Sequence, residues 1–141
     1  MKILMISAIL PSPRTQTPVP TRTFNLMKHL SERNEITLVA QHYQMAKDDH
    51  IDNLWEWVQD LVIFPHHQEI TRRGIMARAK RLGQLLKAGT PHNVLSYYSP
   101  QMQAWIDEKV AENYFDVITC EHTINETYIR SEWQNTVRTV V

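Results

Sequence analysis

Glycine is scarce in this sequence: only Gly74, Gly83 and Gly89 occur among 141 residues. None of the three follows the first apolar run, Ile3 to Ile6. A dinucleotide-binding turn or a P-loop needs glycines at that place, because the backbone must approach or wrap around phosphate groups. The sequence therefore excludes dehydrogenases with that turn and P-loop nucleotide hydrolases.

Cysteines, long apolar stretches and an excess of charge of one sign are also rare or absent in this sequence. Cys120 is the single cysteine, which excludes an internal disulfide framework and a cysteine-based zinc site. No stretch reaches the ~20 apolar residues of a membrane-spanning helix, and Pro11 and Pro13 interrupt the run that could begin a signal peptide. The 15 basic and 15 acidic residues balance, so overall charge indicates no nucleic-acid partner. We expect a cytoplasmic protein.

The first thirty residues carry the clearest structural signal. The run Ile3 to Ile6 is short and wholly apolar, as in a strand buried on both faces. Phe24, Met27 and Leu30 then recur at a spacing of three, which predicts an amphipathic helix. The loop between them, residues 9–21, is our first candidate for a working surface. Loops this long are uncommon in compact domains, and ligands bind beyond the carboxyl ends of parallel strands.

The remaining chain alternates between apolar runs and helical patterns. Ser99 and Pro100 are typical of a helix start. Strands are predicted at residues 35–40, 61–64, 116–120 and 136–141, and helices at 45–59, 69–88, from 99 onward, and at 124–133. This pattern predicts an α/β, Rossmann-like three-layer sandwich with a mainly parallel sheet of about five strands in the order 3-2-1-4-5. We expect residues 1–141 to form a single domain, and an end inside an apolar strand suggests a larger protein.

Glu121 and His122 follow the fourth predicted strand, where the loop after the first strand should also arrive. A carboxylate and an imidazole in one cleft can act as base, acid or hydrogen-bond partners of sugar hydroxyls. The alternative is that either residue caps the following helix or contacts water. Cys120, next to them, is expected to be a small buried apolar residue rather than a nucleophile.

Two pairs of possible metal ligands could suggest a metal site. His122 and Glu126 lie at helical spacing, and His66 and His67 are adjacent. No third ligand accompanies either pair, so we expect no bound metal.

A basic stretch lies in the predicted helix at residues 69–88. Between residues 72 and 87 there is no acidic residue. The basic residues are Arg72, Arg73, Arg78, Lys80, Arg81 and Lys87. The favoured interpretation is a core-packed helix with a solvated basic face. The alternative is an amphipathic helix that lies peripherally on an anionic membrane, at its inner face.

Several segments together resemble the N-terminal domain of GT-B fold glycosyltransferases, in particular glycosyltransferase family 4. The segments are MKILMIS at residues 1–7, LPSP at 10–13, RTFNLMKHL at 22–30, EITLV at 35–39, YSP at 98–100 and FDVITCEH at 115–122. Each segment is short, but their order and spacing agree with the family over nearly the whole chain.

The resemblance implies the acceptor-side half of a two-domain hexosyltransferase that retains the configuration of the transferred sugar. The nucleotide-sugar donor would bind mainly to a C-terminal domain absent from this chain. We therefore expect no cofactor in the chain, and a sugar or lipid-linked acceptor as its ligand. The missing domain or a complementary subunit would be its partner, and the chain alone is expected to be inactive.

The sequence departs from the family at two places. Pro18 and Val19 occupy the positions of a usual Gly-Gly pair, and a proline lacks the N–H that a phosphate contact would use. Glu121, with His122 beside it, stands where several relatives have a functional histidine. The residues expected to face acceptor or donor phosphates in the first loop are Arg14, Thr17, Pro18, Val19, Thr21 and Arg22.

A stand-alone, non-catalytic Rossmann-like binding module, or one subunit of a split glycosyltransferase, is the alternative function.

Overall fold

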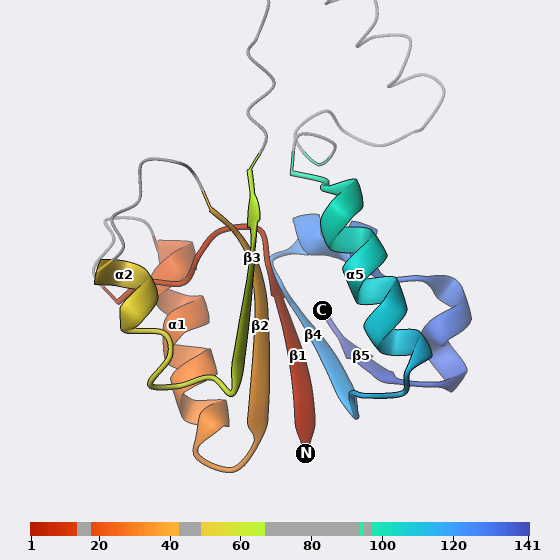
Figure 1. Ribbon diagram of the computed structural model, residues 1–141, viewed down its shortest axis with the longest axis horizontal. Coiled ribbons are helices and arrows are strands. Elements are labelled where there is room, and N and C mark those ends of the chain that lie inside the picture. Colours follow the sequence, from red (N-terminus) through yellow and green to blue (C-terminus); the bar gives the residue numbers. More distant parts are fainter. Residues whose placement is uncertain (14–17, 43–48, 67–93, 95–96) are drawn as a thin grey trace, which may run out of the picture.

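The computed structural model describes residues 1–13, 18–42, 49–66, 94 and 97–141. Along the chain lie β1 (Lys2–Ser7), α1 (Pro18–Ser31), β2 (Glu35–His42), α2 (Asp49–Asp52), β3 (Asp60–Pro65), α5 (Pro100–Ala111), β4 (Val117–Glu121), the 3₁₀ helices η1 (Thr123–Tyr128) and η2 (Ser131–Asn135), and β5 (Arg138–Val140). The five strands form one sheet in the order β3-β2-β1-β4-β5, and every neighbouring pair is parallel (Figure 1). The predicted α/β fold and strand order are confirmed.

Strand β1 is the centre of the sheet and is buried on both faces. Leu4 and Ile6 belong to the apolar cluster on the side of α5, η1 and η2, whereas Met5 belongs to the cluster on the side of α1. The alternation follows from the pleat of a strand, which sends successive side chains to opposite faces. Helix α1 therefore covers one face and α5 the other, as Figure 1 shows.

Helix α5 begins where the sequence predicted. Ser99 is its N-cap, and the Ser99 Oγ accepts a hydrogen bond from the backbone N–H of Met102 at 3.3 Å. Pro100 follows in the first turn, where a missing N–H costs nothing because that group has no partner inside the helix. Met102 and Ile106 are fully buried against the sheet. This end of α5 lies at the carboxyl edge of the sheet (Figure 1).

Two predicted helices are wrong in the described residues. The helix expected at residues 45–59 is helical only at Asp49–Asp52, and turns follow in which Leu54 and Trp57 donate to carbonyls three residues earlier. The helix expected at 124–133 is two 3₁₀ helices, separated by extended backbone at Ile129 and Arg130. In η1 the side chain of Asn125 bonds to strand ends instead of facing solvent, which favours the tighter turn.

The first loop is shorter than predicted, because α1 begins at Pro18. The fixed φ of proline suits the first turn of a helix, which explains this early start. Thr21 and Arg22 therefore lie in the helix rather than in the loop. None of the helices in the described ranges has the length and apolar character needed to cross a membrane.

Candidate functional site at the carboxyl edge

Strand order reverses between β1 and β4. The chain passes from β1 to β2 on one side, while β4 pairs with β1 on the other, and Ser7 lies opposite Glu121 in the register. The carboxyl ends of both strands thus lie side by side. In open parallel sheets this is the place where ligands bind.

Asn125 joins the two strand ends. Its Nδ2 donates to the carbonyl of Glu121 at 2.5 Å and to the carbonyl of Ile6 at 3.4 Å. Both partners are acceptors, so the amide nitrogen must face them and the orientation of the side chain is fixed. The residue is completely buried, and its Oδ1 has no hydrogen-bond partner among the described residues.

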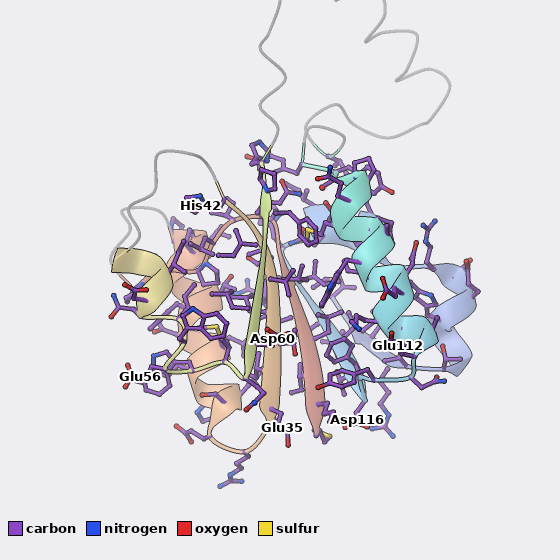
Figure 2. The ribbon with its side chains drawn as sticks, viewed as in Figure 1. Glu35, His42, Glu56, Asp60, Glu112 and Asp116 are labelled. Carbon is purple, nitrogen blue, oxygen red and sulfur yellow. The ribbon has the colours of Figure 1, made fainter. Side chains whose placement is uncertain are left out.

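A second unsatisfied polar atom lies at the same edge of the sheet. The Nε2 of His42, the last residue of β2, is buried and has no hydrogen-bond partner in the described part of the chain. Figure 2 places His42 near the carboxyl edge, whereas Glu35 and Asp116 lie near the amino edge. An unsatisfied buried polar group costs about 1–3 kcal/mol, so native proteins keep few of them.

Glu121 is a buried carboxylate at the end of β4. The residue is 5% exposed, and its Oε1 accepts a hydrogen bond from the Thr119 hydroxyl at 3.2 Å. Thr119 and Glu121 alternate with Ile118 and Cys120, which pack toward α5, so the two polar residues face the side of α1. The predicted exit of Glu121 into a loop is thus wrong by one residue: Glu121 still pairs with Ser7 inside the sheet.

His122 is exposed and leaves the strand with a positive φ of 84° and a ψ of 134°. Backbone of this kind is unfavourable for a residue with a Cβ atom and is often found at functional positions. Its Nδ1 accepts a weak hydrogen bond of 3.4 Å from the N–H of Ile124, so His122 also caps η1. The capping alternative is therefore confirmed for His122, which remains an exposed residue.

Four of the residues predicted in the first loop lie together at the start of α1. Pro18 and Arg22 are exposed, and Val19 and Thr21 are half-buried, all within the start of α1. Arg14 and Thr17 lie outside the described residues. Because both Pro18 and Pro20 lack an N–H, the start of α1 offers fewer backbone donors to an anion than an ordinary helix does.

A polar cluster that the sequence did not predict lies on the α5 side of the same edge. Gln41, in β2, is 2% exposed, and its Nε2 donates to the Tyr128 hydroxyl at 2.9 Å and to the Tyr97 carbonyl at 2.5 Å. The Tyr128 hydroxyl also accepts from the N–H of Ser99 at 2.7 Å and donates to the Tyr97 carbonyl at 3.0 Å. Burial raises the pKa of Tyr128 to about 12, so the hydroxyl keeps its proton at neutral pH.

His66 extends this cluster beyond the end of β3. Its Nδ1 lies 2.7 Å from the Oε1 of Gln41. The Gln41 nitrogen is already engaged as a donor, so His66 must supply the proton at Nδ1. The imidazole also packs against Tyr97, with ring centroids 5.2 Å apart, and Tyr98 stacks on Tyr128 at 5.3 Å.

Cys120 is confirmed as a buried apolar residue. Burial, helped by the nearby charge of Glu121, raises the pKa of the thiol to about 12. At neutral pH the group is therefore a neutral thiol, and its Sγ lies 3.7 Å from the Asn125 carbonyl. Such a thiol is a poor nucleophile.

Within the described residues, no three His, Cys, Asp or Glu side chains converge on a point that could hold a metal ion. His67 itself lies outside those residues. The same holds for the basic residues proposed to face a membrane, Arg72, Arg73, Arg78, Lys80, Arg81 and Lys87.

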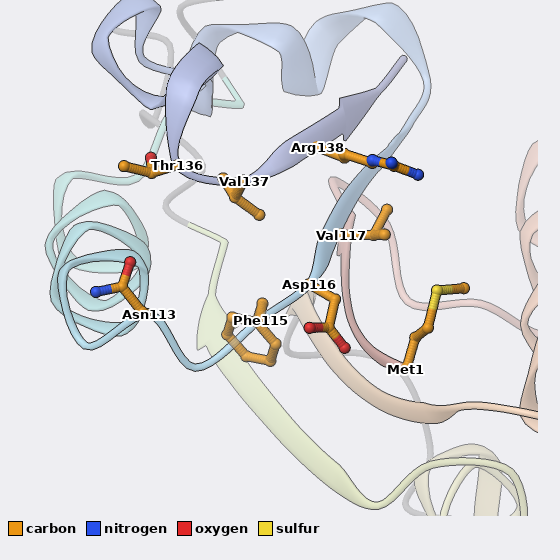
Figure 3. A pocket seen from close by; sticks show the side chains of 8 residues that line it. All are labelled: Met1, Asn113, Phe115, Asp116, Val117, Thr136, Val137 and Arg138. Atoms are coloured by element: carbon orange, nitrogen blue, oxygen red, sulfur yellow. The ribbon is translucent and has the colours of Figure 1, made fainter.

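A pocket of about 580 Å³ lies at the opposite, amino edge of the sheet. It is lined by residues before and at the start of β4 and β5, including Phe115, Asp116, Val137 and Arg138 (Figure 3). None of the predicted site residues is among those that line it.

Comparisons with protein families, characterised proteins and solved structures found no match to this chain.

Proposed function

We propose that this chain is the acceptor-binding domain of a sugar-nucleotide-dependent glycosyltransferase. The observation that carries the proposal is that Ser7 pairs with Glu121 where strand order reverses, with His122 directly after Glu121. A carboxylate and an imidazole at this point can accept and donate hydrogen bonds to sugar hydroxyls, and can move a proton to or from an attacking hydroxyl.

The two residues would have different roles. Glu121 is fixed by Thr119 and by its place inside the sheet, which suits a group that orients a hydroxyl. His122 is exposed, so its imidazole can reach a bound acceptor directly. Asn125, whose Nδ2 donates to the Glu121 carbonyl, adds a buried Oδ1 that has no partner among the described residues.

Sequence resemblance supports the same proposal. The FDVITCEH segment contains β4 and both site residues, and the MKILMIS segment contains β1, which lies beside it. The YSP segment contributes the N-cap of α5 and Tyr98. The ends of these three segments lie near the carboxyl edge of the sheet, where Ser7 pairs with Glu121.

The donor would bind mainly to another domain or subunit. Pro18 and Pro20 remove two of the first four backbone N–H groups of α1, which would otherwise be available to a phosphate. Transfer would then require a second polypeptide unit, and this chain alone would show little or no activity.

Titration of the 141-residue chain with methyl glycosides of glucose, galactose, mannose and N-acetylglucosamine tests the proposal. We expect saturable binding of at least one glycoside, and no comparable binding of UDP-glucose or GDP-mannose. Glu121→Gln and His122→Ala should each weaken binding about tenfold or more, the range for a lost hydrogen bond to a charged group.

Glu35→Gln is the matched control, because Glu35 is an exposed carboxylate at the amino edge (Figure 2). This variant should bind like the wild type. Absence of saturable binding for all four glycosides would contradict the proposal, as would unchanged affinity in both site variants.

The alternative is a non-catalytic Rossmann-like module or one subunit of a split enzyme. The scarcity of phosphate-binding N–H groups at the start of α1 favours it. Glycoside binding together with sugar transfer only after a second polypeptide is added would indicate a split enzyme. Efficient transfer by this chain alone would contradict both functions.

A further inference from the structure

The hydroxyl groups buried where β1 meets β4 have already used their protons within the protein. The Ser7 hydroxyl donates to the carbonyl of Ile9 at 2.6 Å. The Thr119 hydroxyl donates to the Oε1 of Glu121 at 3.2 Å. A hydroxyl has a single proton to donate, so only lone pairs remain available on the oxygens of Ser7 and Thr119.

The side chain of Asn125, which bridges the ends of the two strands, follows the same pattern. Its Nδ2 donates to the carbonyls of Ile6 and Glu121, which engages both N–H bonds of the amide. The Oδ1 of this fully buried residue has no partner among the described residues. The amide therefore also has only an acceptor left.

Glu121 adds a negative charge to these oxygens. It is 5% exposed, and no ion pair of the described residues includes it. Its Oε2 accepts no hydrogen bond from them, yet this oxygen is not one of the fully buried atoms that lack a partner. The Oε2 must therefore retain access to solvent. A largely buried carboxylate with one neutral hydrogen-bond partner is unfavourable, and a cation that reaches it would offset that cost.

The geometry of the sheet brings two of these oxygen groups together. Ser7 and Glu121 are register partners on adjacent parallel strands, which lie about 4.8 Å apart in such a sheet. Their side chains therefore project from the same face, toward α1. An occupant that contacts both must donate hydrogen bonds and carry positive charge. A primary ammonium group has three N–H donors and no acceptor, whereas a sugar hydroxyl has one donor and no charge.

A metal ion is a poorer occupant of this place. Calcium takes at least about six oxygen ligands around one point. In the described ranges of the chain, no three His, Cys, Asp or Glu side chains converge. Glu121 would have to supply the negative charge alone, which suits a singly charged ammonium ion better than a divalent metal.

We propose that the glycosyl acceptor is an amino sugar, whose ammonium group binds to the Glu121 carboxylate and to the Ser7 hydroxyl oxygen. The assignment of a sugar as the ligand rests on the proposed function, and the amino group is what the buried oxygens add to it. The same carboxylate would repel phosphate groups, in agreement with a nucleotide-sugar donor held mainly by another domain or subunit.

Two amines and their N-acetyl derivatives test the proposal: methyl glucosaminide and methyl 6-amino-6-deoxyglucoside. N-acetylation removes the charge and two donors while the sugar ring is kept. Each compound is titrated into the chain at about pH 6, where a primary amine is protonated. We expect at least one amine to bind at least about tenfold more tightly than its N-acetyl derivative, in the range of hydrogen bonds to a charged group. Cyclohexylammonium, which has the charge without the hydroxyls, should bind more weakly than that amine.

Glu121→Gln should remove the preference for the amine, because it keeps the size of the side chain but not its charge. Glu126→Gln is the matched control, since Glu126 is an exposed carboxylate in the neighbouring η1 and its loss changes the net charge equally. This control should keep the wild-type preference. The comparison of the ligands on the wild-type chain needs no variant, so it remains decisive if Glu121→Gln does not fold.

Four results would overturn the proposal. N-acetyl derivatives that bind as tightly as both amines would do so while leaving sugar binding itself intact. A preference for the amine that persists in Glu121→Gln would place the charge elsewhere. Equal affinity for cyclohexylammonium would indicate a general cation site, and displacement of the amine by calcium chloride would indicate a metal site. If no glycoside of either kind binds, the proposed function fails as well, so the two failures are distinguishable.

Discussion

Two polar regions lie at the same edge of the sheet, and their hydrogen bonding differs. On the α5 side, the Tyr128 hydroxyl makes three hydrogen bonds, and both polar atoms of the Gln41 amide have partners. Where β1 meets β4, His122 is exposed and the Oδ1 of Asn125 has no partner among the described residues. The first region is satisfied within the protein, whereas the second keeps an exposed imidazole and a buried amide oxygen without a partner in the described part of the chain.

The difference teaches which polar residues to associate with stability and which with function. A fully bonded buried network rigidifies the structure, and removal of one member leaves the others unsatisfied. A site for a ligand must instead keep polar atoms available and often holds unfavourable backbone, as at His122. We therefore expect substitutions on the α5 side to lower mainly the free energy of unfolding. Substitutions where β1 meets β4 should lower mainly the affinity for glycosides.

The largest expected effect is that of Tyr128→Phe. It removes a hydroxyl that accepts from Ser99 and Gln41 and donates to the Tyr97 carbonyl. The unsatisfied buried groups should lower the free energy of unfolding by about 2–4 kcal/mol in chemical denaturation. Tyr114→Phe is the control, because Tyr114 is 45% exposed and has no hydrogen bond through its hydroxyl among the described contacts. Equal stability of the two variants would contradict the structural role of the network.

The burial of Tyr128 also predicts that the free energy of unfolding depends on pH. Burial raises the pKa of Tyr128 from 10.0 to about 12 in the folded state. The unfolded chain therefore releases this proton at lower pH, so the contribution is complete below pH 10 and is lost as the pH rises toward 12. The stability difference between wild type and Tyr128→Phe should shrink over this range. A constant difference would show that the hydroxyl is not shielded from water.

An intermediate effect is expected at His122. Glycine tolerates a positive φ without the steric cost that a Cβ atom brings, whereas alanine keeps that cost. His122→Gly should thus be about 1 kcal/mol more stable than His122→Ala. Both variants should lose glycoside affinity alike, because both lack the imidazole. If the alanine variant is the more stable, the backbone at His122 is not under strain.

A smaller effect is expected at the ion pair between Asp107 and Arg130. The Arg130 Nη2 lies 2.8 Å from the Asp107 Oδ2, and this hydrogen bond lowers the pKa of Asp107. The side chains are 37% and 43% exposed, so Asp107→Asn should cost only about 0.5 kcal/mol at neutral pH. The pKa of Asp107 is lower in the folded state than its ordinary value of 3.8. The cost of Asp107→Asn should therefore disappear as the pH falls below 3.8 and through the folded-state pKa of Asp107. Asp52→Asn, at an exposed aspartate in α2, should show neither effect.

No effect is expected when iodoacetamide is added to the folded protein at pH 8. Cys120 is 4% exposed, and its pKa of about 12 keeps the thiol protonated. The thiol should react only after the protein is unfolded in guanidinium chloride. Fast alkylation of the folded chain would show that the end of β4 opens. The difference between the region on the α5 side and the region where β1 meets β4 would then be smaller than the structure indicates.

Local patterns predicted most of the fold. Apolar runs indicated the strands, and Ser99 with Pro100 indicated the start of α5, because these signals lie within a few neighbouring residues. Residues 124–133 were predicted as one helix because apolar spacing cannot show that Asn125 bonds to strand ends.

The candidate site was only partly predictable. Glu121 and His122 could be placed because the run at residues 116–120 indicates where the fourth strand ends, and strand order determines which strand ends are neighbours. The network on the α5 side was missed, since Gln41 and Tyr128 are 87 positions apart and neither belongs to a recognisable motif. Their partners become neighbours only when β2, α5 and η1 are packed together.

The most direct test is a residue-resolved map of glycoside binding on the ¹⁵N-labelled chain. A ligand bound where β1 meets β4 should shift the amides of Ser7, Glu121 and His122, and should leave Gln41 and Tyr128 nearly unchanged. Shifts centred on Gln41 and Tyr128 instead would contradict the account, because they would place the binding site in the region that is satisfied within the protein.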